Sequence, residues 1–392
     1  MTPRPLLVNL GALALIGAGF FFLLSRPITE PMPLAQTIAS SSAEVAAAVK
    51  TIIATSTTAA PTKPLKQATT TKAVIQKVVP AAKAAATTTE SAPPTNTAVR
   101  IQNPYSFPPL SSDALNVGAR GALVNILCMP RGGSLYPTSG SGVIIDPRGV
   151  ILTNAHVAQY VLLSQDPRVD ISCTVRTGAP ATARWIPEIL YIPPVWVSAH
   201  VSDILNLHPS GTGEHDYALI AITGTVDGSP LPPSLPFLNP DTRQNIAFQG
   251  DSVLVASYPA EFLGGVTAEY NLFPASSVTT VGQLLTFSTN SIDVLGLGGV
   301  IEAQSGSSGG AVVNAWGRLV GLIATTSSGA TTADRDLHAL ALSYINTDLA
   351  AQNGIDLSTI LAGNILAEAQ TFNTNTAPQL IQKYIDQLSK SH

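Results

Sequence analysis

A serine lies among glycines in residues 304–311, and this pattern could support nucleophilic catalysis. Ser308 is flanked by Gly306 and Gly309, and an apolar run follows. Acyl transfer needs two N–H groups that converge on the oxyanion of a tetrahedral intermediate. The N–H groups of Gly306 and Ser308 are two residues apart, and a loop can converge them because Gly306 lacks a Cβ. Taken alone, a Ser/Gly run is also typical of ordinary loops and linkers.

A histidine and an aspartate that could activate this serine precede it in the chain. A serine hydroxyl is a weak nucleophile near neutral pH, so it needs a general base and a carboxylate that orients that base. His156 ends the sequence Thr-Asn-Ala-His, and Asp216 opens an apolar run at 217–222. Each alone could be an ordinary strand end. The order His156, Asp216, Ser308 predicts a catalytic triad.

Strands are predicted around all three residues. Residues 142–145 and 150–153 flank Asp-Pro-Arg-Gly, whose order favours a type I turn, so they predict a hairpin that ends just before His156. Residues 192–214 are interpreted as a loop-rich insertion, residues 228–240 as a proline-rich connection, and the chain after 346 as helical with a break near 371–378. Further strands are predicted at 124–128, 169–175, 183–191, 252–256, within 270–300, and at 311–314, 318–324 and 337–345.

These motifs resemble those of the trypsin-like (chymotrypsin-fold) serine proteases, and most closely the HtrA/Deg branch. The resemblance covers roughly residues 115–350 and rests on residues 139–145, 153–157, 216–219, 306–310 and 321–323. It implies an all-β fold of two six-stranded β-barrels with the active site in the cleft between them. It assigns the general base to His156, the orienting carboxylate to Asp216, the nucleophile to Ser308, and the oxyanion donors to the N–H groups of Gly306 and Ser308.

The chain departs from the family pattern at three points. Ser307 stands where relatives activated by propeptide cleavage carry an aspartate, so activation by a freed amino terminus is not expected. Ala324 stands where the family often has a serine that donates to the catalytic aspartate. Only 84 residues follow Ser308 and the barrel uses about half of them, so no PDZ domain is expected.

The pocket for the substrate side chain that precedes the cleaved bond has two alternative interpretations. By family analogy, the residue six before the nucleophile, Glu302, lies at the base of this pocket. An unpaired buried carboxylate is costly, so Glu302 could take a substrate Lys or Arg as its partner. In the alternative, which the HtrA-like motifs favour, Glu302 turns outward while Ala303 and Ala324 line a small apolar pocket.

The two cysteines, Cys128 and Cys173, have two alternative states. Both lie in segments that read as strands of the first barrel, and an outward-facing domain would lie in an oxidising compartment. They are therefore candidates for a disulfide. The alternative is two separately buried thiols, which are common in protein cores. Their spacing matches no metal site.

The amino-terminal region predicts a membrane anchor and a tether. Residues 6–24 form an uncharged, largely apolar stretch of 19 residues, which is close to the length of a membrane-spanning helix. A cleaved signal peptide is the alternative, but its apolar region is usually shorter. Residues 26–104 are rich in Ala, Thr, Pro and Lys and predict a disordered tether. The expected order is an anchor at 1–25, this tether, a protease domain at 105–350 and a helical extension at 351–392.

Composition limits the function classes. Only 11% of residues are charged and the formal net charge is −4, which argues against a nucleic-acid partner. The prediction is a membrane-tethered serine endopeptidase with its catalytic domain on the extracytoplasmic side. It would act on protein or peptide substrates without a cofactor or metal. Two alternatives stay open: a catalytically silent protein-binding module of the same fold, and a structural surface protein. The sequence does not determine the oligomeric state.

Overall fold

The computed structural model of the chain describes residues 99–206, 211–261, 263, 265–287 and 291–390. The predicted anchor and the tether up to residue 98 lie outside these residues. Among the described helices, none combines the length and the apolar character needed to cross a bilayer. The helices, 3₁₀ turns included, are α3 (Ser112–Ala122), α4 (Ala155–Ser164), α5 (Pro194–His200), η1 (Val201–Leu205), α6 (Gly265–Tyr270), η2 (Thr332–Asp334), α7 (Leu342–Asn353), α8 (Leu357–Ala362), α9 (Ile365–Asn375) and α10 (Ala377–Ser389).

The first half of the described chain is a closed antiparallel barrel with the strand order β1-β2-β3-β6-β5-β4. Alternate residues of β2 and β3 face opposite sides of the sheet, as the pleat requires. Ile144 and Ile151 point into the barrel core, whereas Val143 and Leu152 join the core of the second half. Its strands are β1 (Leu123–Pro130), β2 (Thr138–Asp146), β3 (Val150–Thr153), β4 (Ile171–Thr177), β5 (Thr182–Tyr191) and β6 (Ala218–Thr225).

The second half is a seven-stranded sheet with the order β8-β7-β11-β12-β13-β10-β9. This corrects the expected second six-stranded barrel, because the sheet stays open between β8 and β9. Strand β9 pairs with β10, and strand β8 pairs with β7, so no described strand pairing joins β9 to β8. The strands are β7 (Ser252–Ser257), β8 (Ala275–Thr280), β9 (Gln283–Leu285), β10 (Val294–Gly296), β11 (Ala311–Asn314), β12 (Leu319–Thr326) and β13 (Leu337–Ala341).

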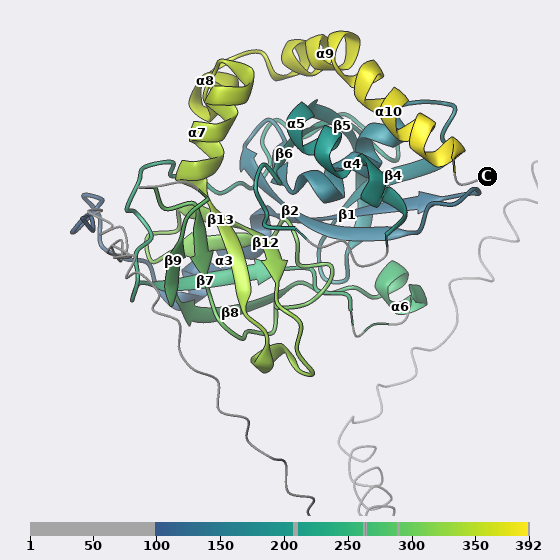
Figure 1. The fold of residues 1–392 in the computed structure, drawn as a ribbon. Coiled ribbons are helices and arrows are strands. Elements are labelled where there is room, and N and C mark those ends of the chain that lie inside the picture. The colour runs from purple at the N-terminus through teal and green to yellow at the C-terminus, as the bar shows by residue number, and fades with distance from the viewer. Residues whose placement is uncertain (1–98, 207–210, 262, 264, 288–290, 391–392) are drawn as a thin grey trace, which may run out of the picture. The chain divides into compact units, whose positions relative to one another are not determined.

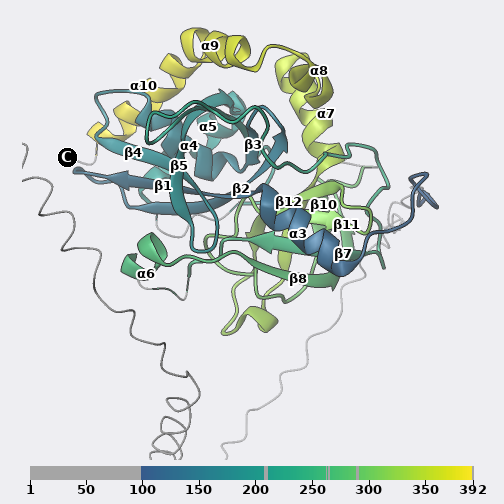
Figure 2. The same ribbon diagram turned by 180° about the vertical axis from the view of Figure 1, so that it is seen from behind.

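The carboxy-terminal helices run from the second sheet across the first barrel (Figures 1 and 2). Helix α7 packs against β12 and β13, α9 lies against β5, and α10 contacts α4 and α5. Tyr384 of α10 is fully buried in the barrel core, and its hydroxyl donates to Gln159 of α4 at 3.0 Å. The helical extension therefore helps to close one side of the first barrel.

The predicted hairpin is confirmed, and two other predictions are wrong. Gly149 has φ +91° and donates to Asp146 O, so residues 146–149 turn as expected. The predicted loop at 192–214 contains α5 and η1, because Pro194 stands in the first turn of α5, where a missing N–H costs nothing. The predicted strand 337–345 ends at Ala341, and α7 follows. A short buried apolar run does not distinguish strand from helix.

Candidate active site

His156 and Asp216 meet at the open end of the first barrel. His156 lies in the first turn of α4, directly after β3, and Asp216 lies two residues before β6. The imidazole Nδ1 is 2.7 Å from Asp216 Oδ2, and the backbone N–H of His156 donates to Asp216 Oδ1 at 3.0 Å. An ionised carboxylate only accepts hydrogen bonds, so Nδ1 carries the proton. In neutral His156, Nε2 is then the free acceptor.

Two opposing effects set the pKa of His156. Burial of the imidazole lowers this pKa, but the charge of Asp216 and its hydrogen bond raise it, and the result lies above the ordinary value. The side chain of Asp216 is 7% exposed and that of His156 is 29% exposed. The carboxylate is thus shielded from water, while the imidazole keeps an open side. Such a group can exchange a proton with a bound molecule near neutral pH.

The loop around Ser308 holds two N–H groups that have no protein acceptor among the described residues, those of Gly306 and Ser308. In a trans peptide the C=O and the N–H point in opposite directions. The carbonyl before Gly306 accepts from Ala260 N–H, and the carbonyl before Ser308 accepts from Gly310 N–H, both at 2.9 Å. The Ser308 N–H is thereby turned away from its own loop, and the Gly306 N–H is turned away from Ala260. Unpaired N–H groups are rare in protein interiors, so this pair is a candidate oxyanion site.

Ser141 on β2 fastens this loop to the first barrel. Its N–H donates to Ser308 O at 2.8 Å, and its hydroxyl donates to Gly306 O at 2.7 Å. The same hydroxyl accepts from Tyr258 N–H, and Thr153 Oγ1 donates to Ser141 O at 2.7 Å. Thr153 lies three residues before His156. Ser141 therefore places the Ser308 loop against the chain segment that leads to His156.

Two glycines allow this close approach. Gly309 has φ +85°, and a Cβ there would lie 2.0 Å from Ser141 O. Gly306 has φ +91°, and a Cβ there would lie 2.8 Å from Tyr258 O. Both neighbours are backbone atoms that cannot move aside cheaply. The glycines flanking Ser308 are therefore needed for the loop conformation itself.

The positions where the chain departs from the family pattern make neutral contacts. The Ser307 side chain is buried and accepts from Ser257 Oγ at 2.9 Å. Ala324 on β12 is buried and offers no donor. The hydrogen bonds recorded for the Asp216 carboxylate both come from His156. The contacts that orient His156 therefore also hold the Asp216 carboxylate in place.

The outward orientation considered for Glu302 is wrong. Glu302 is fully buried, and its Oε2 accepts from Ser277 Oγ at 2.5 Å. Its Oε1 is also buried and has no hydrogen-bond partner among the described residues, and burial raises the pKa of this carboxyl. Ala303 beside it and Ala324 on β12 are buried too.

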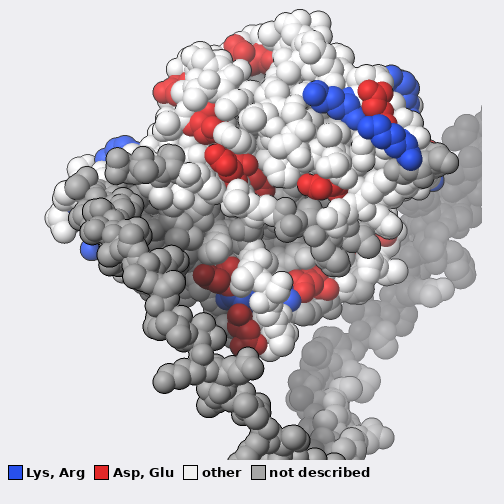
Figure 3. All heavy atoms as spheres, viewed as in Figure 1, with Lys and Arg blue, Asp and Glu red and all other residues white. Residues whose placement is uncertain are grey.

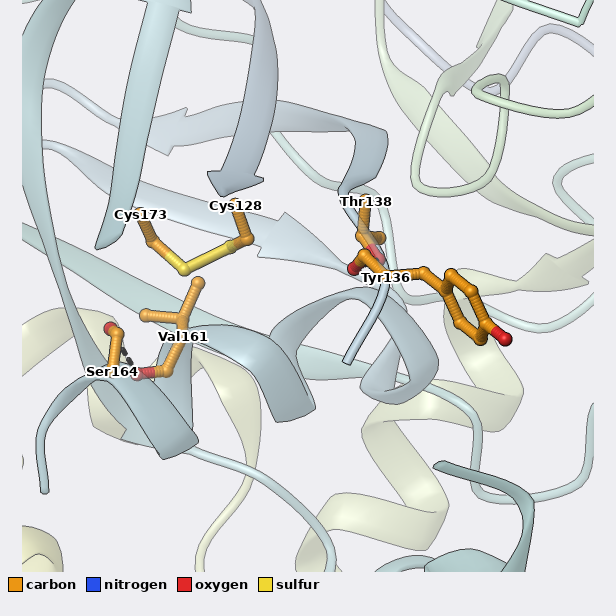
Figure 4. The surroundings of a disulfide bond; sticks show 6 residues. All are labelled: Cys128, Tyr136, Thr138, Val161, Ser164 and Cys173. Carbon is orange, nitrogen blue, oxygen red and sulfur yellow. Dashed lines mark hydrogen bonds between the residues drawn. A yellow bond between two sulfur atoms is a disulfide. The ribbon is translucent and has the colours of Figure 1, made fainter. Parts of the chain in front are cut away.

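Cys128 and Cys173 are joined by a disulfide (Figure 4). They are directly opposite each other on the antiparallel strands β1 and β4, with Cα atoms 4.1 Å apart. Val161 of α4 lies beside the bond, and its carbonyl accepts from Ser164 Oγ (Figure 4). The bond thus ties β1 to β4 next to α4, the helix that carries His156.

Three residues that hold the Ser308 loop were not singled out from the sequence: Ser141, Glu261 and Arg335. Glu261 and Arg335 form a pair that contacts residues 303 and 305. Ser141 had one signal, its place between two glycines directly before a predicted strand. Glu261 and Arg335 lie in unremarkable loop segments 74 residues apart, and only the fold brings them together. Among the described residues, no cluster of three or more metal-ligating side chains forms.

The comparison with protein families agrees with this geometry. Residues 140–322 match the family model of the trypsin-like peptidase domain. The matched range contains His156, Asp216 and Ser308. No curated protein matches the chain. The family match and the barrel together support a chymotrypsin-fold serine protease.

Proposed function

We propose that the protein is a membrane-tethered serine endopeptidase, similar to the HtrA branch, in which Ser308 attacks the peptide carbonyl. His156 Nε2 takes the proton of the Ser308 hydroxyl and later donates it to the leaving amine. Asp216 fixes the tautomer of His156 and stabilises the imidazolium. The N–H groups of Gly306 and Ser308 stabilise the oxyanion. Water then hydrolyses the acyl-enzyme, again with His156 as the base.

One observation carries this proposal. The N–H groups of Gly306 and Ser308 have no acceptor among the described residues, and Ser141 connects their loop to the segment that leads to the His156–Asp216 pair. A silent binding module has no need for two N–H groups without acceptors in one loop. A structural surface protein does not need a buried carboxylate that orients a half-open imidazole. Hydrolysis uses all of these features at once.

We further propose that the enzyme cleaves after small aliphatic side chains. Glu302 is buried against Ser277, and its raised pKa favours the neutral carboxyl. Burial and the hydrogen bond from Ser277 make Glu302 a weaker partner for a substrate Lys or Arg than an open carboxylate. Ala303 and Ala324 would then line the pocket for the substrate side chain, as the sequence resemblance implies.

Hydrolysis of a peptide library by Ser308→Ala and by the unchanged protein tests the main proposal. The alanine variant should lose about 10⁴-fold or more in turnover, because the nucleophile is gone. Ser112→Ala is the matched control, since Ser112 is an exposed serine at the start of α3. Turnover of Ser308→Ala equal to that of the unchanged protein would exclude Ser308 as the nucleophile.

A further inference from the structure

Glu261 and Arg335 form a two-point ion pair beside the loop that carries Ser308. Arg335 Nη1 lies 2.7 Å from Glu261 Oε2, and Nη2 lies 2.7 Å from Oε1. The side chain of Arg335 is 11% exposed and that of Glu261 is 30% exposed. Paired N–H···O bonds between guanidinium and carboxylate fix geometry as well as charge. Glu261 follows β7 and Arg335 precedes β13, so the pair joins two loops of the second sheet.

Both partners also bind the backbone just before Ser308. Arg335 Nη1 donates to Ala303 O at 2.9 Å. Glu261 Oε2 accepts from Ser305 N–H at 3.0 Å. Residues 303 and 305 are therefore held by the two ends of one ion pair.

A single peptide unit, between Ser305 and Gly306, connects these contacts with the proposed oxyanion donor, the Gly306 N–H. Ser305 O accepts from Ala260 N–H, and Ala260 is the residue before Glu261. Ser305 is thus fixed at its N–H by Glu261 and at its C=O by Ala260. Because the peptide is planar and trans, fixing Ser305 O also fixes the direction of the Gly306 N–H.

The orientation of the peptide before Gly306 must be fixed by contacts with other residues. A glycine adopts left-handed and right-handed backbone conformations about equally, so its own side chain does not select the orientation of the preceding peptide. The side chain of Ser307, the residue before the nucleophile, carries no charge, and its hydroxyl accepts from the neutral Ser257 Oγ. The charged groups Glu261 and Arg335 bind the backbone of Ser305 and Ala303.

We propose that Glu261 and Arg335 are positioning residues that keep the Gly306 N–H directed at the oxyanion. This inference rests on the proposed function. The ion pair stabilises the oxyanion-binding orientation of the loop in the intact chain, so no freed amino terminus is needed to form it. The pair acts through Ser305 and Gly306 and touches no reacting atom.

The test compares Glu261→Gln and Arg335→Gln with the unchanged full-length protein, and includes the double variant. Loss of one oxyanion donor costs about 10²–10³-fold in kcat, so partial loss of its orientation should cost about 10–100-fold. KM should change less than about threefold, because the loop contacts mainly the transition state. The double variant should be about as impaired as either single variant, since the two residues form one unit.

A peptide boronate distinguishes positioning from a general loss of structure. The boronate forms a tetrahedral adduct with the serine, so its affinity should fall by the same factor as kcat. Binding of an uncleaved peptide to the same variants on a Ser308→Ala background should stay within about threefold of its starting value. Arg335→Lys keeps the positive charge and should recover part of the boronate affinity. Arg168→Gln is the matched control, because Arg168 also donates two hydrogen bonds to one carboxylate, that of Asp166, away from this loop.

The outcomes separate this inference from the proposed function. No hydrolysis and no boronate binding by the unchanged protein would contradict the proposed function itself. Wild-type kcat and boronate affinity in Glu261→Gln and Arg335→Gln would overturn the positioning role alone. Equal losses of boronate affinity, peptide binding and melting temperature would also overturn it, since they would show a purely structural role. Arg335→Lys keeps the test decisive if a glutamine variant fails to fold.

Discussion

At the residue scale, Asp216 controls both the position and the charge state of His156. It binds the imidazole Nδ1 and the backbone N–H of the same residue, so the ring cannot turn without breaking a bond to the carboxylate. The charge of Asp216 outweighs the effect of burial and raises the pKa of His156. The proposed general base must be neutral, so we expect activity above the pKa of His156 and a loss of activity as the pH falls through it.

Asp216→Asn is expected to change the pH profile as well as the rate. The amide can donate to Nδ1, which favours the wrong tautomer, so kcat should fall by about 10⁴-fold. The charge that raises the pKa is also gone, so the acidic limb of kcat/KM should move to lower pH. The measurement is the pH dependence of peptide hydrolysis. An acidic limb that stays in place would show that Asp216 does not set the pKa of His156.

Glu302→Gln tests the nature of the substrate pocket. If burial keeps the carboxyl neutral, the amide is nearly isosteric and cleavage should still follow Val, Ala or Ile with less than about a tenfold change in kcat/KM. Sequencing of the products from a peptide library measures this preference. Cleavage predominantly after Lys or Arg, lost in Glu302→Gln, would show instead that a charged Glu302 recognises the substrate.

Candidate catalytic residues could be singled out from the sequence, whereas the residues that hold them in place could not. His156, Asp216 and Ser308 each lie in a local pattern with a chemical meaning. Ser141, Glu261 and Arg335 act only through contacts between distant segments, such as Ser141 Oγ to Gly306 O across 165 residues. Glu302 shows the same limit, because its burial against Ser277 depends on how two loops pack.

At the element scale, local signals located most strands, and the errors arose where tertiary packing decides. The turn at 146–149 is fixed by its own residues, since Gly149 takes the left-handed position and Asp146 caps the turn. The end of β13 carries no such signal. Leu340 and Leu342 are both fully or almost fully buried, although one lies in a strand and the other in a helix.

The disulfide between β1 and β4 is expected to stabilise the first barrel. Its half-cysteines are 45 residues apart, so the chain-entropy model gives about 4 kcal/mol from restricting the unfolded chain. Replacing Cys128 and Cys173 together by alanine should lower the free energy of unfolding by about 2–5 kcal/mol. Urea denaturation measures this difference. Treating the unchanged protein with a reductant before denaturation should have a similar effect and is the control.

Thiol titration of the unreduced, denatured protein checks the bond itself. The expected result is no free thiol. Two free thiols in protein isolated without reductant would contradict the disulfide, and the double alanine variant should then lose less stability than the chain-entropy model gives.

At the scale of the whole molecule, charge is divided unevenly along the chain. Residues 1–98 hold 8 of the 20 Lys and Arg and 3 of the 24 Asp and Glu, a net charge of +5, so the rest of the chain carries 12 − 21 = −9. Much of the surface in Figure 3 is uncharged, and acidic side chains are scattered over it. Positive charge is therefore concentrated before residue 99, and negative charge after it.

The proposed anchor at residues 6–24 predicts tight membrane association. Each charge at the centre of a membrane helix costs about 2.5–3.5 kcal/mol, so replacing Leu13 and Ile16 by arginine should release the protein to the soluble fraction. Thr69→Arg in the tether is the control and should stay in the membrane after alkaline extraction. A catalytic domain on the extracytoplasmic side should be degraded when a protease is added to intact cells. Protection from that protease would contradict the proposed topology.

The most direct test of the central claim is covalent labelling by a fluorophosphonate probe. Only a serine activated by a base and supported by an oxyanion site reacts rapidly with this probe. The account predicts that the folded, unchanged protein is labelled at Ser308, as located by mass spectrometry, and that heat-denatured protein and Ser308→Ala are not labelled. Absence of labelling in the folded protein, or labelling at a serine other than Ser308, would contradict it.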